Sequence, residues 1–191
     1  MHQTPSLNAT IKKICIKHPG KKRNAPEELF TTDRDELLYD QDINVIVEVI
    51  DDSKAAFDIV SIALKNGKAV VSASKKMIAE HLPELLELQQ NTGEPFLYEA
   101  AACASIPVIR NLEEYYDNDL LHSIKAIVNG STNFILTKMF EEKLDYKQSL
   151  ILAQQLGFAE SNPTLDVEGF DAVNKWTLLL AHAYGILDSP N

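Results

Sequence analysis

Cysteine is scarce in this 191-residue sequence, which holds only Cys15 and Cys103. Two isolated cysteines suit a reducing compartment better than a disulfide framework, so we expect a cytoplasmic protein. Long apolar runs are missing as well, since none approaches the roughly 20 residues that span a bilayer. The five histidines show no zinc-ligand spacing. The sequence therefore excludes a disulfide scaffold, a membrane-spanning protein and a cysteine–histidine metal site.

Basic residues are outnumbered by acidic ones, 18 to 28, and the formal net charge is −10. An acidic chain of this kind is unsuited to general nucleic-acid binding, so we expect no nucleic-acid partner. A phosphate-binding P-loop and a Gly-x-Ser-x-Gly nucleophile elbow are also missing. Apolar residues make up 45% of the chain, which is normal for a globular protein. The length allows one full domain, or one domain and part of another.

The first half of the chain alternates between apolar strand patterns and helical patterns with short links. Such alternation predicts βαβ units and an α/β fold with a parallel sheet of the Rossmann type. Two of the strands are almost continuously apolar, which predicts burial on both faces. The expected strands are residues 11–17, 29–32, 45–50, 69–71 and 96–98. The expected helices are a short one from Asp33 to Leu38, one capped by Asp52 or Ser53, and one that carries the apolar stripe from Ile78 to Leu86 and ends at Gly93.

The second half no longer alternates one strand with one helix, so we expect an α+β unit there. We place the division between 1–105 and 106–191. Asp145 and Gln148 have capping-box spacing and predict the start of a helix. The expected elements are helices at 108–116, 132–142, 145–157 and 169–184, a strand at 122–129 with one wet face, and a polar loop at 159–166.

The densest polar cluster runs from Glu160 to Lys175. Asp171 and Lys175 are four residues apart and share one face of the expected helix. A surface ion pair is the simple interpretation of such spacing. The rest of this helix is apolar, however, and a lysine partly removed from water is suited to acid–base chemistry.

Two further segments directly follow strands, where ligands of open parallel sheets bind. The first is Ser72–Lys76, which places Lys75 near a cofactor or substrate, unless it is an ordinary basic loop. The second is Glu99–Pro107, whose small residues allow close backbone approach. This second segment is otherwise a tight connection between domains.

The segments Val71–Lys76, Tyr98–Ile109, Asn129–Ile135 and Gly157–Lys175 together resemble homoserine dehydrogenase, and the resemblance covers essentially the whole chain. It implies a Rossmann cofactor domain followed by an α+β catalytic and dimerisation domain. It also implies the interconversion of L-homoserine and L-aspartate 4-semialdehyde with a nicotinamide cofactor, on the route to threonine, isoleucine and methionine. We therefore expect a homodimer.

The resemblance also implies roles for individual residues. Lys175 would exchange the proton at the substrate oxygen, and Lys75 would lie near nicotinamide and substrate. Substrate-binding acids would be Glu160, Asp166 and Asp171. Gly157 and Glu160 would contact the cofactor. Sodium would be bound by the Glu99 side chain and by the carbonyl oxygens of Ala102, Ala104 and Ile106.

Three departures from the family pattern stand out. Ser74 precedes Lys75, where the family often has Asn, and Ala104 with Ser105 replaces common glycines. The Gly-x-Gly-x-x-Gly turn that holds the pyrophosphate is missing. We therefore expect a piece of the family's chain, without its first Rossmann unit and the end of its catalytic domain, and little or no activity from the 191 residues alone.

Residues 12–23 contain six basic side chains and no acid. A solvated basic edge is the simple interpretation. In the resembling family the end of the second Rossmann strand carries an acid for the ribose of NAD, or basic residues for the 2′-phosphate of NADP. Lys17, Lys21 and Arg23 therefore indicate NADP, although NAD stays possible. The sequence is also compatible with an inactive remnant that serves as a dimerisation or binding module, and with a different amino-acid dehydrogenase.

Overall fold

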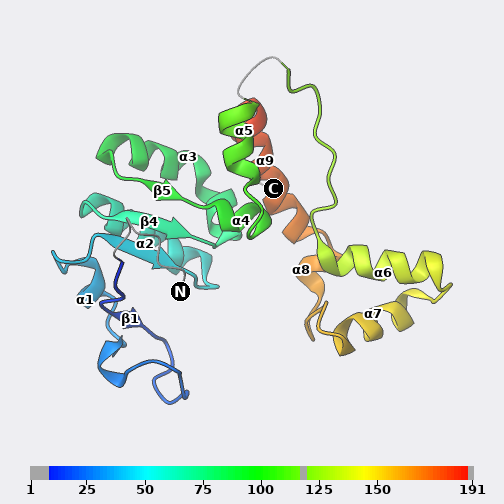
Figure 1. Cartoon of the computed structure of the whole chain (residues 1–191), viewed down its shortest axis with the longest axis horizontal. Helices are drawn as coiled ribbons and strands as arrows, with labels where there is room; N and C mark the ends of the chain where they lie inside the picture. Colours follow the sequence, from blue (N-terminus) through cyan, green and yellow to red (C-terminus); the bar gives the residue numbers. More distant parts are fainter. Residues whose placement is uncertain (1–8, 117–119, 189–191) are drawn as a thin grey trace.

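The computed structural model of the chain describes residues 9–116 and 120–188 (Figure 1). A parallel sheet lies in its first part, with the strand order β3-β4-β5. Two helices connect these strands in sequence, so each connection is a βαβ unit. This arrangement confirms the expected parallel sheet of Rossmann type. The elements are β3 (Val45–Glu48), α2 (Ser53–Lys65), β4 (Ala69–Ser72), α3 (Lys75–Thr92) and β5 (Phe96–Leu97).

A second parallel sheet pairs only two short strands, β1 (Ile14–Cys15) and β2 (Phe30–Thr31). Both lie inside the ranges expected from sequence but are much shorter. The described residues contain no strand that joins this sheet to β3, so the expected single sheet is divided in two. The short helix η1 (Glu27–Leu29) lies between β1 and β2, and the short helix α1 (Asp35–Leu38) lies in the link from β2 to β3.

Local signals set the helix boundaries in this part. The Asp52 carboxylate accepts a hydrogen bond from the Ala55 amide and caps α2. Helix α3 ends at Gly93, whose φ of 72° is readily adopted only by glycine. Inside α3, His81 is non-helical, and the kink lies just before Pro83. The kink places Pro83 in the first turn of the helical part that follows it, where its missing N–H costs no hydrogen bond.

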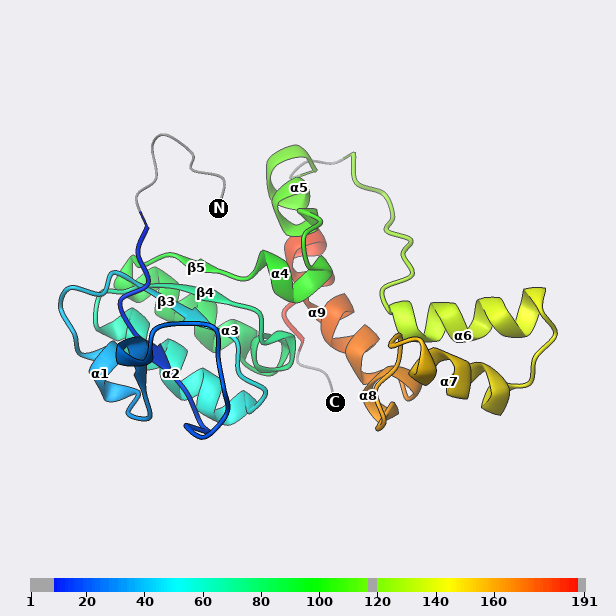
Figure 2. The same ribbon diagram turned by 60° about the horizontal axis from the view of Figure 1, so that its bottom comes forward.

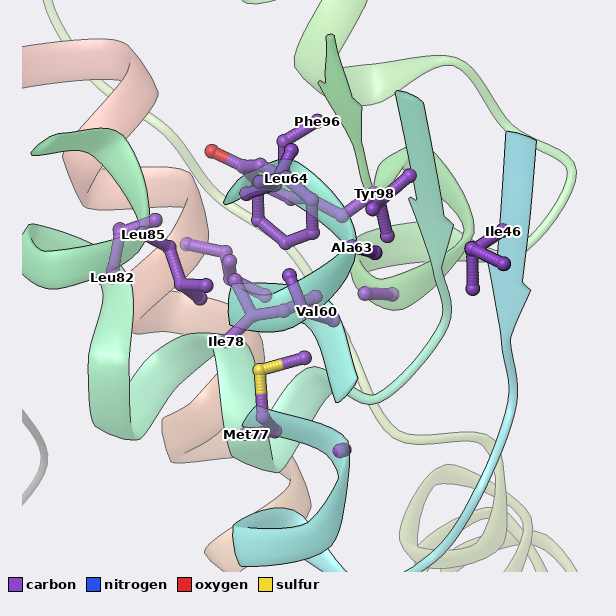
Figure 3. Packing of buried hydrophobic residues seen from close by; sticks show 14 of the residues in the cluster. Ile46, Val60, Ala63, Leu64, Met77, Ile78, Leu82, Leu85, Phe96 and Tyr98 are labelled. Carbon is purple, nitrogen blue, oxygen red and sulfur yellow. The ribbon is translucent and has the colours of Figure 1, made fainter. Parts of the chain in front are cut away.

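The main core lies between the three-stranded sheet and the helices α2 and α3 (Figure 3). Ile46 and Val70 point into this core, together with Val60 and Ile78. Val45 and Val47, in contrast, are 49% and 66% exposed. The prediction that these strands are buried on both faces is therefore wrong, because the helices cover one face of the sheet only.

The second part of the described chain is helical. Figures 1 and 2 show α5 beside α9, whereas α6 and α7 form a pair that projects away from the sheet. Leu178 of α9 is fully buried in the main core, so this helix is anchored to the first part. The helices are α4 (Glu99–Cys103), α5 (Val108–Tyr115), α6 (Gly130–Glu141), α7 (Tyr146–Gln155), α8 (Thr164–Val167) and α9 (Phe170–Tyr184). None of the described helices is both long and apolar enough to cross a membrane.

Some details of the second part differ from the sequence expectations. Residues 122–129 form no strand, because no neighbouring strand in the described residues offers them a hydrogen-bonding ladder. The expected polar loop at 159–166 contains the start of α8. The capping box of Asp145 and Gln148 is confirmed, with both reciprocal hydrogen bonds present at the start of α7.

Candidate functional site

Lys75 is the first residue of α3 and follows the carboxyl end of β4. The buried carboxylate of Glu48 holds this turn in place. Glu48 accepts hydrogen bonds from the Ile50 amide at 2.7 Å and from the Ser72 hydroxyl at 2.5 Å. The Ser74 hydroxyl lies 2.8 Å from the same carboxylate. One carboxylate therefore ties the ends of β3 and β4 together, and so fixes the backbone that presents Lys75.

Asp171 and Lys175 lie on α9 and form the ion pair that their spacing predicted, at 2.7 Å between Oδ2 and Nζ. The other oxygen of Asp171 lies 3.1 Å from Nζ of Lys75. The Lys175 ammonium also donates to the Val128 carbonyl at 2.7 Å. The side chains of Lys175 and Asp171 are only 19% and 11% exposed, so this is not an ordinary surface pair. The structure thus places both lysines on one nearly buried carboxylate.

Asn129 connects Asp171 to a second acid. Its side-chain nitrogen donates to Asp166 at 2.7 Å and to Asp171 at 3.0 Å. Its side-chain oxygen accepts from the Thr132 amide and so caps α6. The Ser131 hydroxyl lies 2.8 Å from Asp166. The start of α6 is thereby fixed to the same group of charges.

The charge of Asp171 is stabilised where it lies. Burial alone would raise its pKa, but hydrogen bonds from Lys175, Asn129 and Lys75 outweigh burial and hold the pKa below its ordinary value. Asp171 therefore remains ionised at neutral pH and neutralises part of the charge of the two lysines.

A cavity of about 570 Å³ opens beside these lysines. A volume of this size is typical of sites for small molecules and cofactors. Lys75 and Lys175 line it, together with alanines of the 100–104 segment and residues 124–128. Lys125 adds a third lysine to the wall. The cavity lies at the carboxyl ends of β4 and β5, which lead into Lys75 and α4. This is the edge where parallel sheets bind ligands.

The segment expected to bind sodium forms one wall of this cavity, which Ala102, Ala104 and Ile106 line. Glu99 caps α5, since its two oxygens accept from the amides of Ile109 and Arg110 at 2.9 and 3.0 Å. A carboxylate has about four acceptor positions, so this capping leaves capacity for a cation. The Glu99 carboxylate and the backbone carbonyls of this segment are all oxygen ligands, which hard cations prefer. No group of three or more His, Cys, Asp or Glu side chains in the described residues could hold a metal ion.

Ala104 has a φ of 53° and a ψ of −111°, a conformation that suits glycine. Strain of this kind destabilises the folded state by about 1–3 kcal/mol when the residue is not glycine. A glycine removes this strain but lowers the free energy of unfolding by about 0.4–1 kcal/mol, because it raises the entropy of the unfolded chain. We expect Ala104→Gly to raise the free energy of unfolding by about 1 kcal/mol, measured by urea titration. Ala183→Gly in α9 serves as the control and should lower it by about 1 kcal/mol. A lower stability of Ala104→Gly would contradict this interpretation.

Other expected site residues lie apart from the two lysines. Glu160 is exposed between α7 and α8, and Gly157 ends the turn after α7 with a φ of 78°. Within the described residues, neither one is hydrogen-bonded or ion-paired to Lys75 or Lys175. The loop with Lys17, Lys21 and Arg23 lies beside the two-stranded sheet, away from α4 and α9 in both views (Figures 1 and 2).

The basic run itself divides into two parts. Lys12 pairs with Asp40 and Asp42, and Lys13 pairs with Glu36. The Arg23 guanidinium donates to the Lys21 carbonyl and lies over the ring of Phe30. The two lysines that pair with acids thus precede β1. The other basic residues of the run lie in the loop that follows β1, which is where a 2′-phosphate site would be expected.

Sequence reasoning missed Asn129, Ser131 and Lys125. An Asn three residues before Thr132 is a helix-capping signal, and it could have placed Asn129 at the start of α6. Its contacts with Asp166 and Asp171 span 37 and 42 residues, and no local pattern reveals them.

Two family models match the chain, and together they cover most of it. Residues 2–99 match the model described as "Homoserine dehydrogenase, NAD binding domain". Residues 107–190 match the model described as "Homoserine dehydrogenase".

Curated relatives and solved structures give the same result. Homoserine dehydrogenase of Bacillus subtilis is 41% identical over 181 residues, which is 94% of this chain and 42% of the relative. The Synechocystis enzyme is 36% identical over 96% of this chain and 43% of the relative. The crystal structure of S. aureus homoserine dehydrogenase at pH 6.0 has a TM-score of 0.76 and 33% identity, over 94% of this chain and 45% of that one.

One similar solved structure was determined with a cofactor. A hyperthermophilic archaeal homoserine dehydrogenase in complex with NADPH has a TM-score of 0.70 and 33% identity, and covers 81% of this chain and 48% of that one. This chain spans less than half the length of these relatives.

Proposed function

Because the chain belongs to the homoserine dehydrogenase family, we propose that the full-length protein interconverts L-homoserine and L-aspartate 4-semialdehyde with a nicotinamide cofactor. The observation that carries this proposal is the pair of lysines held by Asp171 beside the cavity. The test is reduction of NADP by the full-length protein with L-homoserine. Absence of turnover by a folded, full-length protein would favour an inactive binding module instead.

The geometry of Lys175 supports a role in proton transfer. An ammonium group has three donors. In the described residues, two of them are directed at Val128 and Asp171, and the third is available for a substrate oxygen in the cavity. When bound, the nicotinamide accepts or supplies the hydride. Lys175 would then give a proton to the alkoxide in reduction and take the hydroxyl proton in oxidation.

Lys75 and the acids have supporting roles in this proposal. Lys75 stands at the turn fixed by Glu48, and its positive charge would stabilise negative charge developing on the substrate oxygen. Asp171 would orient both lysines, with Asp166 linked to it through Asn129. Glu160 is exposed, and we assign it to the substrate ammonium group, which needs a carboxylate partner.

Three further features of the full-length protein belong to this proposal. The carbonyl oxygens of Ala102, Ala104 and Ile106 would hold sodium together with Glu99. A homodimer is supported by apolar side chains that project from α6, since Leu136 and Phe140 are 63% and 77% exposed. The division at 105/106 stays a prediction.

The matched NAD-binding domain leaves the choice between NAD and NADP open, and we propose NADP. The support is the basic loop after β1, in which Lys17, Lys21 and Arg23 can pair with the 2′-phosphate. We expect the full-length protein to have a higher kcat/KM with NADPH than with NADH. The double variant Lys21→Ala/Arg23→Ala should raise the KM for NADPH about tenfold or more, because each lost charged hydrogen bond costs about 1.5–3 kcal/mol.

A matched control is available within the same basic run. Lys12 is already paired with Asp40 and Asp42, so Lys12→Ala should leave the preference for NADPH unchanged. A clear preference of the full-length protein for NADH would refute the assignment.

A further inference from the structure

His182 lies on α9, seven residues after Lys175, so the two side chains share one face of the helix. The imidazole is nearly buried, with 13% of its side chain exposed. Its Nε2 lies 2.8 Å from the Tyr98 hydroxyl, and its Nδ1 lies 2.8 Å from the Glu113 carboxylate. Neither the family resemblance nor the proposed mechanism uses these contacts.

In the sequence, the two partners of His182 flank the Glu99–Ile106 segment that lines the cavity. Tyr98 directly precedes Glu99, where the alanine-rich segment begins. Glu113 lies on α5, which begins two residues after Ile106, where the segment ends. The imidazole therefore contacts the residue just before the Glu99–Ile106 segment and a residue of the helix that follows it, and this segment lines the same cavity as Lys175.

We propose that His182 is a positioning residue that holds Tyr98 and α5, which flank the Glu99–Ile106 segment in sequence, against α9, and so sets the position of this cavity wall relative to the Lys175 ammonium. This proposal rests on the proposed dehydrogenase function. The consequence for catalysis follows from geometry, because a displacement of about 1 Å at a reacting group can cost roughly 100-fold in rate.

The hydrogen-bonding chemistry is self-consistent. The Glu113 carboxylate can only accept, so Nδ1 of His182 carries the proton, and in the neutral ring Nε2 accepts from the Tyr98 hydroxyl. Tyr98 is only 6% exposed. Burial, together with the nearby charge of Glu113, raises the pKa of the Tyr98 phenol, which keeps the hydroxyl protonated as a donor. A protonated imidazole would donate to the Tyr98 oxygen instead, so the contact survives in both states.

Near His182, α9 also packs through apolar side chains. Leu178, one turn before His182, is fully buried in the main core, and Ala181 packs against the same core. Apolar packing of this kind is not directional, whereas hydrogen bonds have defined lengths and angles. The two polar contacts of His182 can therefore help to define the register of α9 against Tyr98 and Glu113.

The test compares three variants of the full-length protein. His182→Phe keeps a planar ring and loses both nitrogens. His182→Gln retains one donor and one acceptor. Tyr184→Phe, at a half-exposed tyrosine of the same helix, is the control. We expect His182→Phe to lower kcat by about 10- to 100-fold, with the KM for NADPH changed less than about twofold. His182→Gln should restore part of the loss, and Tyr184→Phe should have no effect.

Amide hydrogen exchange separates this proposal from the proposed function. We expect faster exchange at 98–107 in His182→Phe than in Tyr184→Phe, whether or not the protein is active. Full kcat in a folded but less stable His182→Phe protein would reduce His182 to a purely structural residue and overturn the proposal. Unchanged exchange at 98–107 would overturn it as well, even if the protein had no dehydrogenase activity.

Discussion

Lys175→Met is expected to lower the kcat of the full-length protein for L-homoserine oxidation by about 10²- to 10⁴-fold, the usual contribution of a general acid–base group. Methionine keeps most of the apolar stem but cannot donate or accept the proton. The KM for NADP should change little, because the side chain faces Asp171, Val128 and the cavity, whereas the basic loop that we assign to NADP lies elsewhere. Steady-state kinetics with each substrate varied in turn would measure both effects.

The matched control is Lys65→Met, at an exposed lysine on α2. It removes the same charge without touching the cavity, and its kcat should equal that of the unmodified protein. A Lys175→Met protein with normal kcat would remove Lys175 from the proton transfer, whatever its effect on stability.

Asp171→Asn is expected to lower the free energy of unfolding by about 2 kcal/mol at neutral pH, the typical value for a hydrogen bond to a charged group. The amide keeps the shape of the side chain but leaves Lys75 and Lys175 without their shared negative charge. Two neighbouring cations without a counter-charge should also shift out of position. We therefore expect a fall in kcat/KM of at least tenfold.

The stability difference should depend on pH in a defined direction. The folded-state pKa of Asp171 lies below its ordinary value, so the stabilisation is fully present above about pH 4 and is lost as the pH falls through the lowered pKa. Urea titrations over this range should show the unmodified protein and Asp171→Asn converging at low pH. The control, Asp58→Asn at an exposed position of α2, should change stability by less than about 0.5 kcal/mol. A stability difference that persists unchanged in acid would contradict the ionised state of Asp171.

The α/β organisation could be predicted from the sequence because its signals are local. The capping box at Asp145 and the spacing of Asp171 and Lys175 are contained within a few residues. The exposed face of β3 could not be predicted, because an apolar strand pattern does not report whether helices cover one face or two. Residues 122–129 have strand-like alternation, but a strand also needs a partner that the alternation does not supply.

The candidate site shows the same division between local and distant information. Lys75, Asp171 and Lys175 are found from their local context and from the family resemblance. The contact from Lys175 to Val128 spans 47 residues, and that from Tyr98 to His182 spans 84. Such contacts depend on how α9 packs against the sheet, and no periodicity encodes them. For this reason the distant contacts of Asn129 and His182 emerge only from the structure.

The most direct measurement follows the hydride itself. The full-length protein would be incubated with L-aspartate 4-semialdehyde and NADPH that carries deuterium at both C4 positions, and the product would be analysed by mass spectrometry. The proposed function predicts L-homoserine with one deuterium bound to C4, formed at a rate that Lys175→Met lowers at least 100-fold. A folded protein that forms no homoserine, or forms homoserine without deuterium, would contradict it.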